Sequence, residues 1–332
     1  MNISLIVCTY KRPKSILTLL KSVFEQSVLP FEILIIDGSP DNDTDLVLAE
    51  YKSVSSLKYF QVGAETRGLI KQRNFGISKI DPVSDVVAFL DDDLILKNDY
   101  FAELALTFQL NPGAIGVGGI DMLENRFFRK VENERYSQFS YYELDGWVVK
   151  DSIRFKVRKL FGLLTDLQPD IIPSYSHGRS GFPPNGRTYC VEHLIGMSMA
   201  FRKSLFEEIT FSSYFEGYGL YEDFDFSVRA LKYGDLYVNT NAHVWHYHDP
   251  NGRPNTYRYG KMVIRNGWYV WKQRFPKNSS SAIFKWHATA FLLALIRLLN
   301  SFTGPNRLDA FKEFIGRLAG WFSLWFNKPT LQ

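Results

Sequence analysis

The chain has 332 residues, of which 45% are hydrophobic and 22% are charged, so it can bury a large core and is not disordered. The formal net charge of +4 hides an asymmetry, because residues 251–332 carry 13 Lys and Arg against 2 Asp and Glu, whereas residues 1–250 carry 26 against 33. An acidic body argues against a general nucleic-acid binder. A basic tail is what an anionic membrane surface attracts.

The N-terminal residues and the cysteines suggest the compartment. Cys8 and Cys190 are too few for a disulfide framework and wrongly spaced for zinc, so we expect a reducing compartment. The opening "MNISLIVCTYKRP" has no basic n-region, and its apolar run is too short for a secretory signal. We therefore expect a first β-strand there and a mature protein that begins at Met1.

Strand-like and helical patterns alternate along the first hundred residues. We expect strands at 3–9, 32–37, 57–62 and 85–90, and helices at 14–26, 44–51 and 68–80. Continuous apolar strands separated by amphipathic helices predict an α/β fold with a Rossmann-like, mostly parallel sheet covered by helices on both faces. Patterning breaks up over 122–190, resumes at 191–203, and predicts a helix at 222–234 with Gly234 as its stop.

Acidic residues follow two of the predicted strands. Asp37 ends "EILIID", and Asp91, Asp92 and Asp93 follow "VVAFL". Ligands of such sheets bind beyond the carboxyl ends of the strands, so we expect these acids to face one crevice. Three adjacent carboxylates repel one another unless a cation offsets them, which a divalent ion sharing its shell with phosphate oxygens would do. An ordinary acidic turn is the alternative.

Several segments together resemble the family 2 glycosyltransferases, which are nucleotide-sugar-dependent enzymes with the GT-A fold. The segments are "SLIVCTYKRP", "IIDGS", "RGLIKQRNFG", "FLDDD", "YEDFDFSVRALKYG" and "AHVWH". Each is weak alone, and their order and spacing over residues 3–246 carry the resemblance. It fades at 122–190 and after about residue 275, where acceptor choice is usually settled in this family.

The resemblance implies a division of the chain. A GT-A domain would cover residues 1–249, with a nucleotide-binding half at 1–120 and an acceptor-binding and catalytic half at 121–249. A basic, Trp-rich helical extension would follow at 250–332.

The resemblance also implies a donor site at the strand ends. The implied donor-binding residues are Thr9, Tyr10, Arg12, Asp37, Arg73, Asp91 and Asp92. A carboxylate at Asp37 can accept the imide N–H of uracil or thymine, which favours a UDP or dTDP sugar. Alternatively, Thr9 is a strand end without a role and Arg73 is a solvated helix arginine.

By the same resemblance, the three aspartates form a DxD motif for Mn²⁺ or Mg²⁺. Asp93 would coordinate the metal directly, with Asp91 as the other outer member of the motif. His246 would be a third ligand to the metal or the diphosphate. His243 and His248 compete for that role, and a structural histidine is the alternative.

The acidic cluster "YEDFDF" would supply the base. Glycosyl transfer needs a group that takes the proton of the acceptor hydroxyl as the diphosphate leaves. The resemblance selects Asp223 as that base and Glu222 as a residue that orients the sugar or acceptor. One base opposite one leaving group predicts an inverting, in-line displacement. Acids in the first turn of a helix can also be capping residues, and Asp225 could be only that.

The C-terminal segment is aromatic as well as basic. Five of the seven tryptophans follow residue 250, namely Trp268, Trp271, Trp286, Trp321 and Trp325. The longest apolar run, 288–296, is too short to span a bilayer, so we expect residues 280–332 to lie in the membrane interface with Trp and Phe inserted. The alternative is helices packed on the body or on a dimer partner, which keeps oligomerisation possible.

These features predict a metal-dependent hexosyl- or deoxyhexosyltransferase. Its acceptor would be a lipid-linked or surface-polysaccharide glycan, and its place would be cytoplasmic, peripheral on the inner face of the cell membrane. A nucleotidyltransferase is an alternative, but "CTYKRP" lacks the glycines of its phosphate loop. A processive synthase would need spanning helices, which we do not expect. A non-catalytic sugar-nucleotide-binding or membrane scaffold is the remaining alternative.

Overall fold

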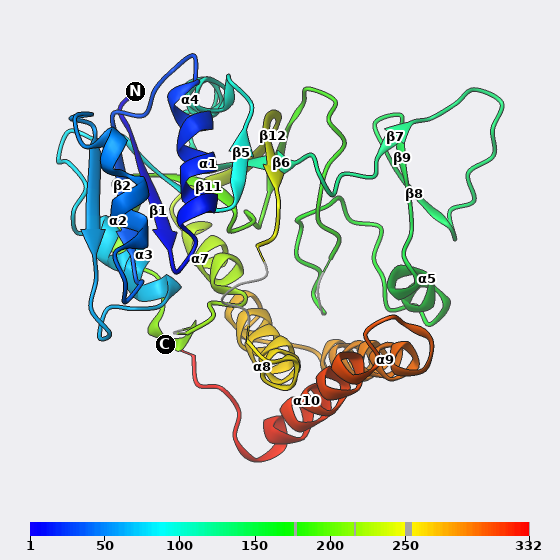
Figure 1. Ribbon diagram of the computed structural model, residues 1–332. Helices are drawn as coiled ribbons and strands as arrows, with labels where there is room; N and C mark the ends of the chain where they lie inside the picture. Colours follow the sequence, from blue (N-terminus) through cyan, green and yellow to red (C-terminus); the bar gives the residue numbers. More distant parts are fainter. Residues whose placement is uncertain (176–177, 216, 250–253, 332) are drawn as a thin grey trace. The chain divides into compact units, whose positions relative to one another are not determined.

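The computed structural model describes residues 1–175, 178–215, 217–249 and 254–331 (Figure 1). The chain divides into two compact units. Unit 1 comprises Met1–Asn125 and Pro184–Arg253, and unit 2 comprises Arg126–Pro183 and Pro254–Gln332. The chain therefore leaves unit 1 once, returns to it, and ends in unit 2. The functional division at residue 249 stays a prediction.

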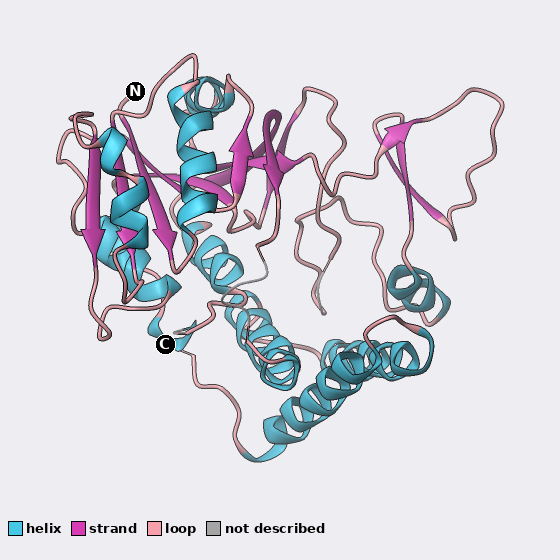
Figure 2. Cartoon of the chain, in the orientation of Figure 1, coloured by secondary structure: helices cyan, strands magenta, loops and turns pink. Residues whose placement is uncertain are grey.

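Unit 1 is a sheet with helices around it (Figure 2). Its strands are β1 (Ile3–Thr9), β2 (Glu32–Asp37), β3 (Leu57–Gln61), β4 (Val86–Asp91), β5 (Leu94–Leu96), β6 (Ala114–Asp121), β10 (Thr188–Val191), β11 (Ser198–Arg202) and β12 (Asp235–His246). Its α-helices are α1 (Pro13–Phe24), α2 (Asp43–Val47), α3 (Leu69–Ile77), α4 (Tyr100–Leu110), α6 (Leu205–Glu208) and α7 (Glu222–Ala230). Two 3₁₀ helices, Ala49–Tyr51 and Ser213–Phe215, complete it.

The described strands of unit 1 form one nine-stranded sheet. Its order is β10-β12-β6-β11-β4-β1-β2-β3, and β5 pairs with β12 off this path. The strands β3, β2, β1 and β4 run parallel, as do β6 and β12, whereas β11 is antiparallel to both β4 and β6. Thr9 is paired with Asp37, and Cys8 with Asp91. The acidic strand ends therefore come to one edge of the sheet, and the predicted common crevice stays a prediction.

Helices cover both faces of this sheet because side chains alternate along its strands. Leu5 and Val7 of β1 lie in a core cluster with α1 and α4, which contribute Leu19 and Phe101. Ile6 points to the opposite face, where a Cβ on Gly76 of α3 would come within 2.8 Å of its side chain. The predicted α/β fold, with a sheet covered on both sides, is confirmed.

Most predicted elements of the first hundred residues exist within two or three residues of their expected bounds. The predicted stop at Gly234 is wrong, because α7 ends at Ala230. A Cβ at position 234 would lie 2.6 Å from the carbonyl oxygen of Gly113. The glycine thus permits a close approach of two loops and does not end the helix.

Unit 2 combines a small sheet with long helices. The antiparallel strands β7 (Phe128–Arg129), β9 (Trp147–Lys150) and β8 (Tyr141–Leu144) form the sheet in that order. The helices are α5 (Ile153–Leu160), α8 (Thr256–Arg274), α9 (Ser280–Thr303) and α10 (Arg307–Phe326). Side-chain caps begin two of them: Asn255 accepts a hydrogen bond from the Arg258 amide and Ser279 from the Ala282 amide.

Three tryptophans form the core of the helical part of unit 2. Trp268, Trp271 and Trp286 are at most 5% exposed. The Trp268 ring lies 4.8 Å from that of Trp286. Trp286 is the one of these three that lies in the predicted interfacial segment 280–332, and for it the prediction of membrane insertion is wrong, because α8 and α9 bury the three rings against each other. Trp325 differs, since it is 64% exposed.

The helix α9 is longer than the apolar run within it. Its 24 residues, about 36 Å in length, include an 18-residue window apolar enough to cross a membrane by length and composition, and 28% of that window is buried. The expectation that this segment is too short to span a bilayer is therefore wrong. The argument against a processive synthase from the absence of such a helix no longer holds.

Candidate active site

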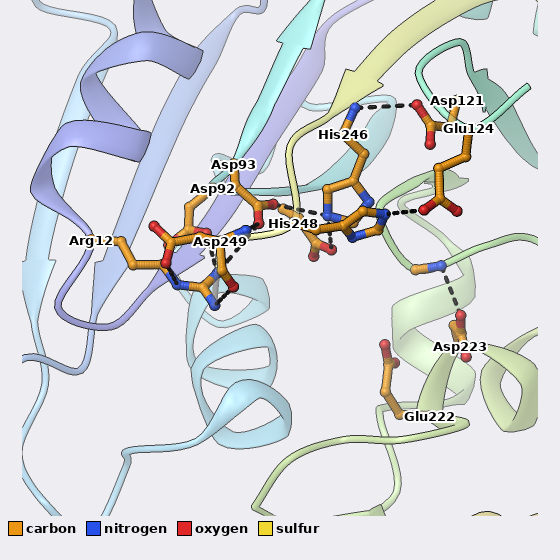
Figure 3. A network of polar contacts seen from close by, with 12 residues as sticks. Arg12, Asp92, Asp93, Asp121, Glu124, Glu222, Asp223, His246, His248 and Asp249 are labelled. Carbon is orange, nitrogen blue, oxygen red and sulfur yellow. Dashed lines mark hydrogen bonds and ion pairs between the residues drawn. The ribbon is translucent and has the colours of Figure 1, made fainter. Parts of the chain in front are cut away.

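The metal candidate lies where β4, β5 and β12 meet. β4 ends at Asp91, a turn carries Asp92 and Asp93, and β5 pairs with the end of β12 so that Leu94 faces His246. The Nε2 atom of His246 is 3.0 Å from Asp93 Oδ1 (Figure 3). The same nitrogen is 3.9 Å from Asp91 Oδ2. The local chain reversal therefore gathers two carboxylates and an imidazole.

These three side chains fit a divalent cation. One ligand atom from each of Asp91, Asp93 and His246 lies within 4.8 Å of the other two. Asp93 Oδ1 is buried and accepts no well-aligned hydrogen bond from the described residues, although His246 is near. Carboxylate oxygens and one imidazole nitrogen suit Mn²⁺, and a buried acceptor without a donor is what a bound cation satisfies.

The opposite charges of the imidazole and the two carboxylates in this group stabilise one another. Burial by itself would lower the pKa of His246, but the close Asp93 carboxylate and the charge of Asp91 raise it. Burial would raise the pKa of Asp93, but His246 and the Asp249 amide hold it below its ordinary value. Asp93 is therefore ionised at neutral pH, as a ligand must be.

The middle aspartate faces away from this cluster. Asp92 is 3% exposed and accepts hydrogen bonds from the Thr9 hydroxyl (2.6 Å) and from Arg12 Nη1 (2.9 Å). Arg12 also donates to the carbonyl of Asp249 (3.1 Å) and lies 3.6 Å from Asp93 (Figure 3). Thr9, Arg12 and Asp92 thus fasten the β1–α1 loop to the aspartate turn.

The other predicted donor residues lie nearby at the same edge of the sheet. Asp37 is fully buried and accepts hydrogen bonds from the amide and hydroxyl of Ser39 (2.8 and 2.5 Å) and from the Tyr59 hydroxyl (2.9 Å). Because the side chain is covered on all sides, a nucleobase could reach it only after neighbouring groups move. Tyr10 is beside the guanidinium of Arg67, 5.6 Å from the ring centroid. The nucleotide-binding roles of Asp37 and Tyr10 stay predictions.

Arg73 joins the aspartate turn to the second acidic cluster. It is 2% exposed, so it is not a solvated helix arginine. Its Nη1 contacts Glu222 Oε1, its Nη2 donates to the Gly196 carbonyl (3.0 Å), and Nη2 lies 3.6 Å from Asp91 Oδ1. Burial raises the pKa of Glu222 to about 8, with Asp223 and Asp91 adding to the rise against the lowering effect of Arg73.

Asp223 has the opposite properties. Its side chain is 21% exposed and accepts hydrogen bonds from the amides of Gly196 and Phe224, each at 2.8 Å. Burial by itself would raise the pKa of Asp223, but His193 and these two amides hold it below its ordinary value. Asp223 is therefore ionised and reachable, whereas Glu222 is buried and holds its proton at neutral pH. The third acid, Asp225, is fully buried and pairs with Arg229 (2.7 Å).

A second group of ionisable residues flanks the metal candidate. His248 lies against the His246 ring, with 3.9 Å between centroids, and its Nε2 is 3.2 Å from Glu124 Oε1. Asp121 Oδ1 accepts a hydrogen bond from the His246 amide at 3.2 Å. Asp121 and Asp249 were not predicted from the sequence. Asp121 ends the buried strand β6, as Asp37 ends β2, so the same strand-end signal could have found it, whereas Asp249 lies outside the strands and carries no such signal.

Comparison with known proteins identifies the family and the fold of the chain. The family profile described as "Glycosyl transferase family 2" matches residues 4–181, just over half of the chain. Of the solved structures, that of GalNAc-T7 with UDP, GalNAc and Mn²⁺ covers 91% of this chain and 58% of its own, at 16% identity and a TM-score of 0.52. That likeness supports the GT-A fold. The chain belongs to glycosyl transferase family 2.

Two curated relatives match parts of the chain. One is the glucosyl-dolichyl phosphate glucuronosyltransferase of Haloferax volcanii, 31% identical over 121 residues, which are 36% of this chain and 38% of that protein. The other is the uncharacterized glycosyltransferase RC0461 of Rickettsia conorii, 36% identical over 98 residues, which are 29% of this chain and 16% of that protein. The matched segments thus span well under half of either relative.

Proposed function

We propose that this family 2 glycosyltransferase is a metal-dependent, inverting enzyme that moves a hexosyl or deoxyhexosyl group from a nucleoside diphosphate sugar to a lipid-linked or surface-polysaccharide glycan. The observation that carries the proposal is the pairing of two clusters within unit 1. Asp91, Asp93 and His246 form a ligand set, and Arg73 links Asp91 to the acidic pair Glu222 and Asp223.

The ligand set would hold Mn²⁺ or Mg²⁺. When bound, such a cation neutralises the charge that develops on the departing diphosphate. GalNAc-T7, whose fold this chain shares, contains UDP and Mn²⁺ in its solved structure. UDP or dTDP is the nucleotide that we propose, with the base near Asp37 and the remaining contacts from Thr9, Tyr10 and Arg12.

Asp223 is the proposed general base. The acceptor O–H passes its proton to the Asp223 carboxylate while the oxygen forms a bond to the anomeric carbon. The bond from that carbon to the diphosphate oxygen breaks with its electron pair, so the configuration inverts and no covalent enzyme intermediate forms. Glu222 is unsuited to take this proton, because its raised pKa leaves it protonated at neutral pH. Held by Arg73, it would instead donate to or orient the sugar or acceptor.

We also propose that unit 2 docks on the inner face of an anionic membrane, where a lipid-linked acceptor is presented. The Haloferax relative is named for a dolichyl phosphate substrate. The helices α9 and α10 each carry an exposed apolar stripe opposite their buried face. The stripe residues are Phe284, Phe291, Leu299, Phe302, Leu308, Phe311, Ile315, Phe322, Trp325 and Phe326.

Helical spacing makes these stripes continuous. Phe284, Phe291 and Phe302 are separated by 7 and 11 residues, so they share one side of α9, whereas Trp286 and Ala290 face the core. Residues 251–332 carry the positive charge that anionic headgroups attract. Because the other side of α9 packs against α8 and α10, we place the helix in the plane of the interface.

The first experiment is calorimetric titration of UDP, dTDP and GDP into the protein, with and without Mn²⁺. We expect Mn²⁺-dependent binding of one nucleotide, lost in Asp93→Ala and retained in Asp45→Ala, an exposed acid that pairs with Lys52. If Asp93→Ala bound the nucleotide as the wild type does, the metal assignment would be wrong. Asp223→Asn should keep nucleotide binding and lose glycosyl transfer. Loss of both would show that the base has been assigned to the wrong residue.

A second experiment tests the membrane surface. In co-sedimentation with phosphatidylglycerol vesicles, the double variant Phe291→Glu, Phe302→Glu should stay in the supernatant. The matched control Leu46→Glu, Leu110→Glu changes two residues of unit 1 that are 69% and 70% exposed, and should bind like the wild type. If the Phe291→Glu, Phe302→Glu variant still bound the vesicles, the proposed membrane docking would be wrong. A dimer that dissociates in that variant would instead assign the stripe to a second copy.

A further inference from the structure

A short loop in unit 1 is fixed against the helix that carries the proposed base. Residues 192–197 connect β10 to β11. The Leu194 amide donates to Ser227 Oγ (3.0 Å) on α7, and the Gly196 amide donates to Asp223 Oδ2 (2.8 Å). Arg73 holds the Gly196 carbonyl from the other side (3.0 Å). The loop therefore has a defined position relative to Asp223.

His193 lies at the start of this loop, against the base. It is 8% exposed, and its ring packs on Phe224 with 4.5 Å between centroids and 33° between planes. Its Nε2 atom is 3.7 Å from Asp223 Oδ2. A ring packed at that distance can orient the carboxylate through an ion pair when the imidazole is protonated.

No other basic side chain in the described part of the chain comes within ion-pair distance of Asp223. The cation of Arg73 is engaged by Glu222. Glu222 on the same helix holds its proton at neutral pH, so the remaining charge that faces the base is the Asp91 carboxylate from β4. A like charge of this kind favours a protonated Asp223 carboxyl, which could not accept a proton.

We propose that His193 is a positioning residue for the glycosyl transfer: it holds the Asp223 carboxylate in its reactive rotamer and keeps it ionised among acidic neighbours. The inference rests on the proposed function, in which Asp223 is the base. In the proposed mechanism, His193 contacts neither the donor nor the acceptor and acts through Asp223. Nothing in its local sequence singles it out, since the contact joins residues 30 positions apart.

Three variants separate this role from a packing role. His193→Phe keeps a ring on Phe224 and removes the nitrogen, whereas His193→Gln keeps a neutral N–H donor at similar reach. Phe224→Leu weakens the ring contact and leaves the imidazole. Thermal unfolding of all three identifies variants that do not fold.

The primary readout needs no acceptor. With ¹³Cγ-labelled aspartate, the Asp223 carbon is assigned by its absence in Asp223→Asn, and its titration is followed by NMR in EDTA. We expect the pKa of Asp223 to rise in His193→Gln and in His193→Phe relative to the wild type, and to stay near the wild-type value in Phe224→Leu. An unchanged titration in a folded His193→Gln protein overturns the inference.

The kinetic readout is release of UDP or dTDP from UDP-glucose, UDP-N-acetylglucosamine or dTDP-rhamnose with Mn²⁺, with water as the acceptor. We expect kcat to fall about 10- to 100-fold in His193→Phe at unchanged nucleotide Kd, and His193→Gln to recover most of it, with the acid limb of the pH profile moved to higher pH. Equal losses in both variants, or wild-type kcat in His193→Phe, contradict the inference. Wild-type activity in Asp223→Asn would instead refute the base assignment of the proposed function.

Discussion

Replacing Glu222 by Gln should make the protein more stable relative to the wild type as the pH rises. Glu222 is 4% exposed, and its Oε2 atom has no hydrogen-bond partner among the described residues. Glutamine keeps the shape of the side chain and an acceptor for Arg73, but it cannot ionise. The difference between the two proteins therefore isolates the titration of one buried carboxyl.

The magnitude follows from the shift in pKa. Burial raises the pKa of Glu222 from 4.5 to about 8. Because the folded value is the higher one, the contribution of Glu222 to stability is fully present below pH 4.5 and is lost as the pH rises to 8. Each pH unit in this window changes the free energy of unfolding by about 1.4 kcal/mol, which gives a ceiling of roughly 5 kcal/mol for Glu222 across the window.

The assay is urea unfolding of both proteins in EDTA at pH 5, 6, 7, 8 and 9. Far-UV circular dichroism follows the whole chain, and hydrogen exchange of the peptide 86–90 reports on unit 1. We expect the free-energy difference to shift in favour of Glu222→Gln up to pH 8 and then to level off. A difference that stays constant from pH 5 to pH 9 would show that Glu222 is ionised in the folded protein. The electrostatic preference for Asp223 as the base would then fail.

Three further outcomes follow from close contacts and burial. A Cβ at Gly196 would come within 3.0 to 3.2 Å of both acids of the pair on α7, so Gly196→Ala should lower kcat about 10-fold or more with little change in nucleotide Kd, measured by UDP release. Burial raises the pKa of the Cys8 thiol to about 12, whereas Cys190 is exposed, so one equivalent of a thiol reagent should react with the native protein and peptide mapping should place it at Cys190. A Cβ at Gly316 would overlap the Tyr257 carbonyl oxygen, so Gly316→Ala should lower the melting temperature of unit 2, followed by tryptophan fluorescence.

The sheet of unit 1 could be predicted because its signals are local. A run such as "EILIID" has four consecutive apolar residues between its two acids, which is typical of a strand covered on both faces, and β2 has the expected bounds. The aspartates at the ends of β2 and β4 could be placed at one edge, because parallel strands present their carboxyl ends together. The prediction for unit 2 was less accurate, since α9 extends far beyond the apolar run 288–296 from which it was inferred.

The C-terminal tryptophans show why composition misled. A basic, aromatic segment fits a membrane interface and a helical core equally well, since both bury aromatic rings. Only the packing of α8 against α9 separates Trp268 and Trp286, which are in the core, from Trp325, which is exposed. Helical spacing alone could not show which of these rings are buried, because a helix such as α9 is apolar on both its buried and its outward side.

The sequence by itself determined the fold class of the chain and the acidic groups that are candidates for chemistry, because alternation and strand ends are properties of neighbouring residues. Tertiary structure decided what each group does. Arg73 meets Glu222 across 149 positions, and Thr9 meets Asp92 across 83. Such contacts set which carboxyl is buried, which is ionised and which faces a cation. Burial and charge act through space, so no local pattern encodes them.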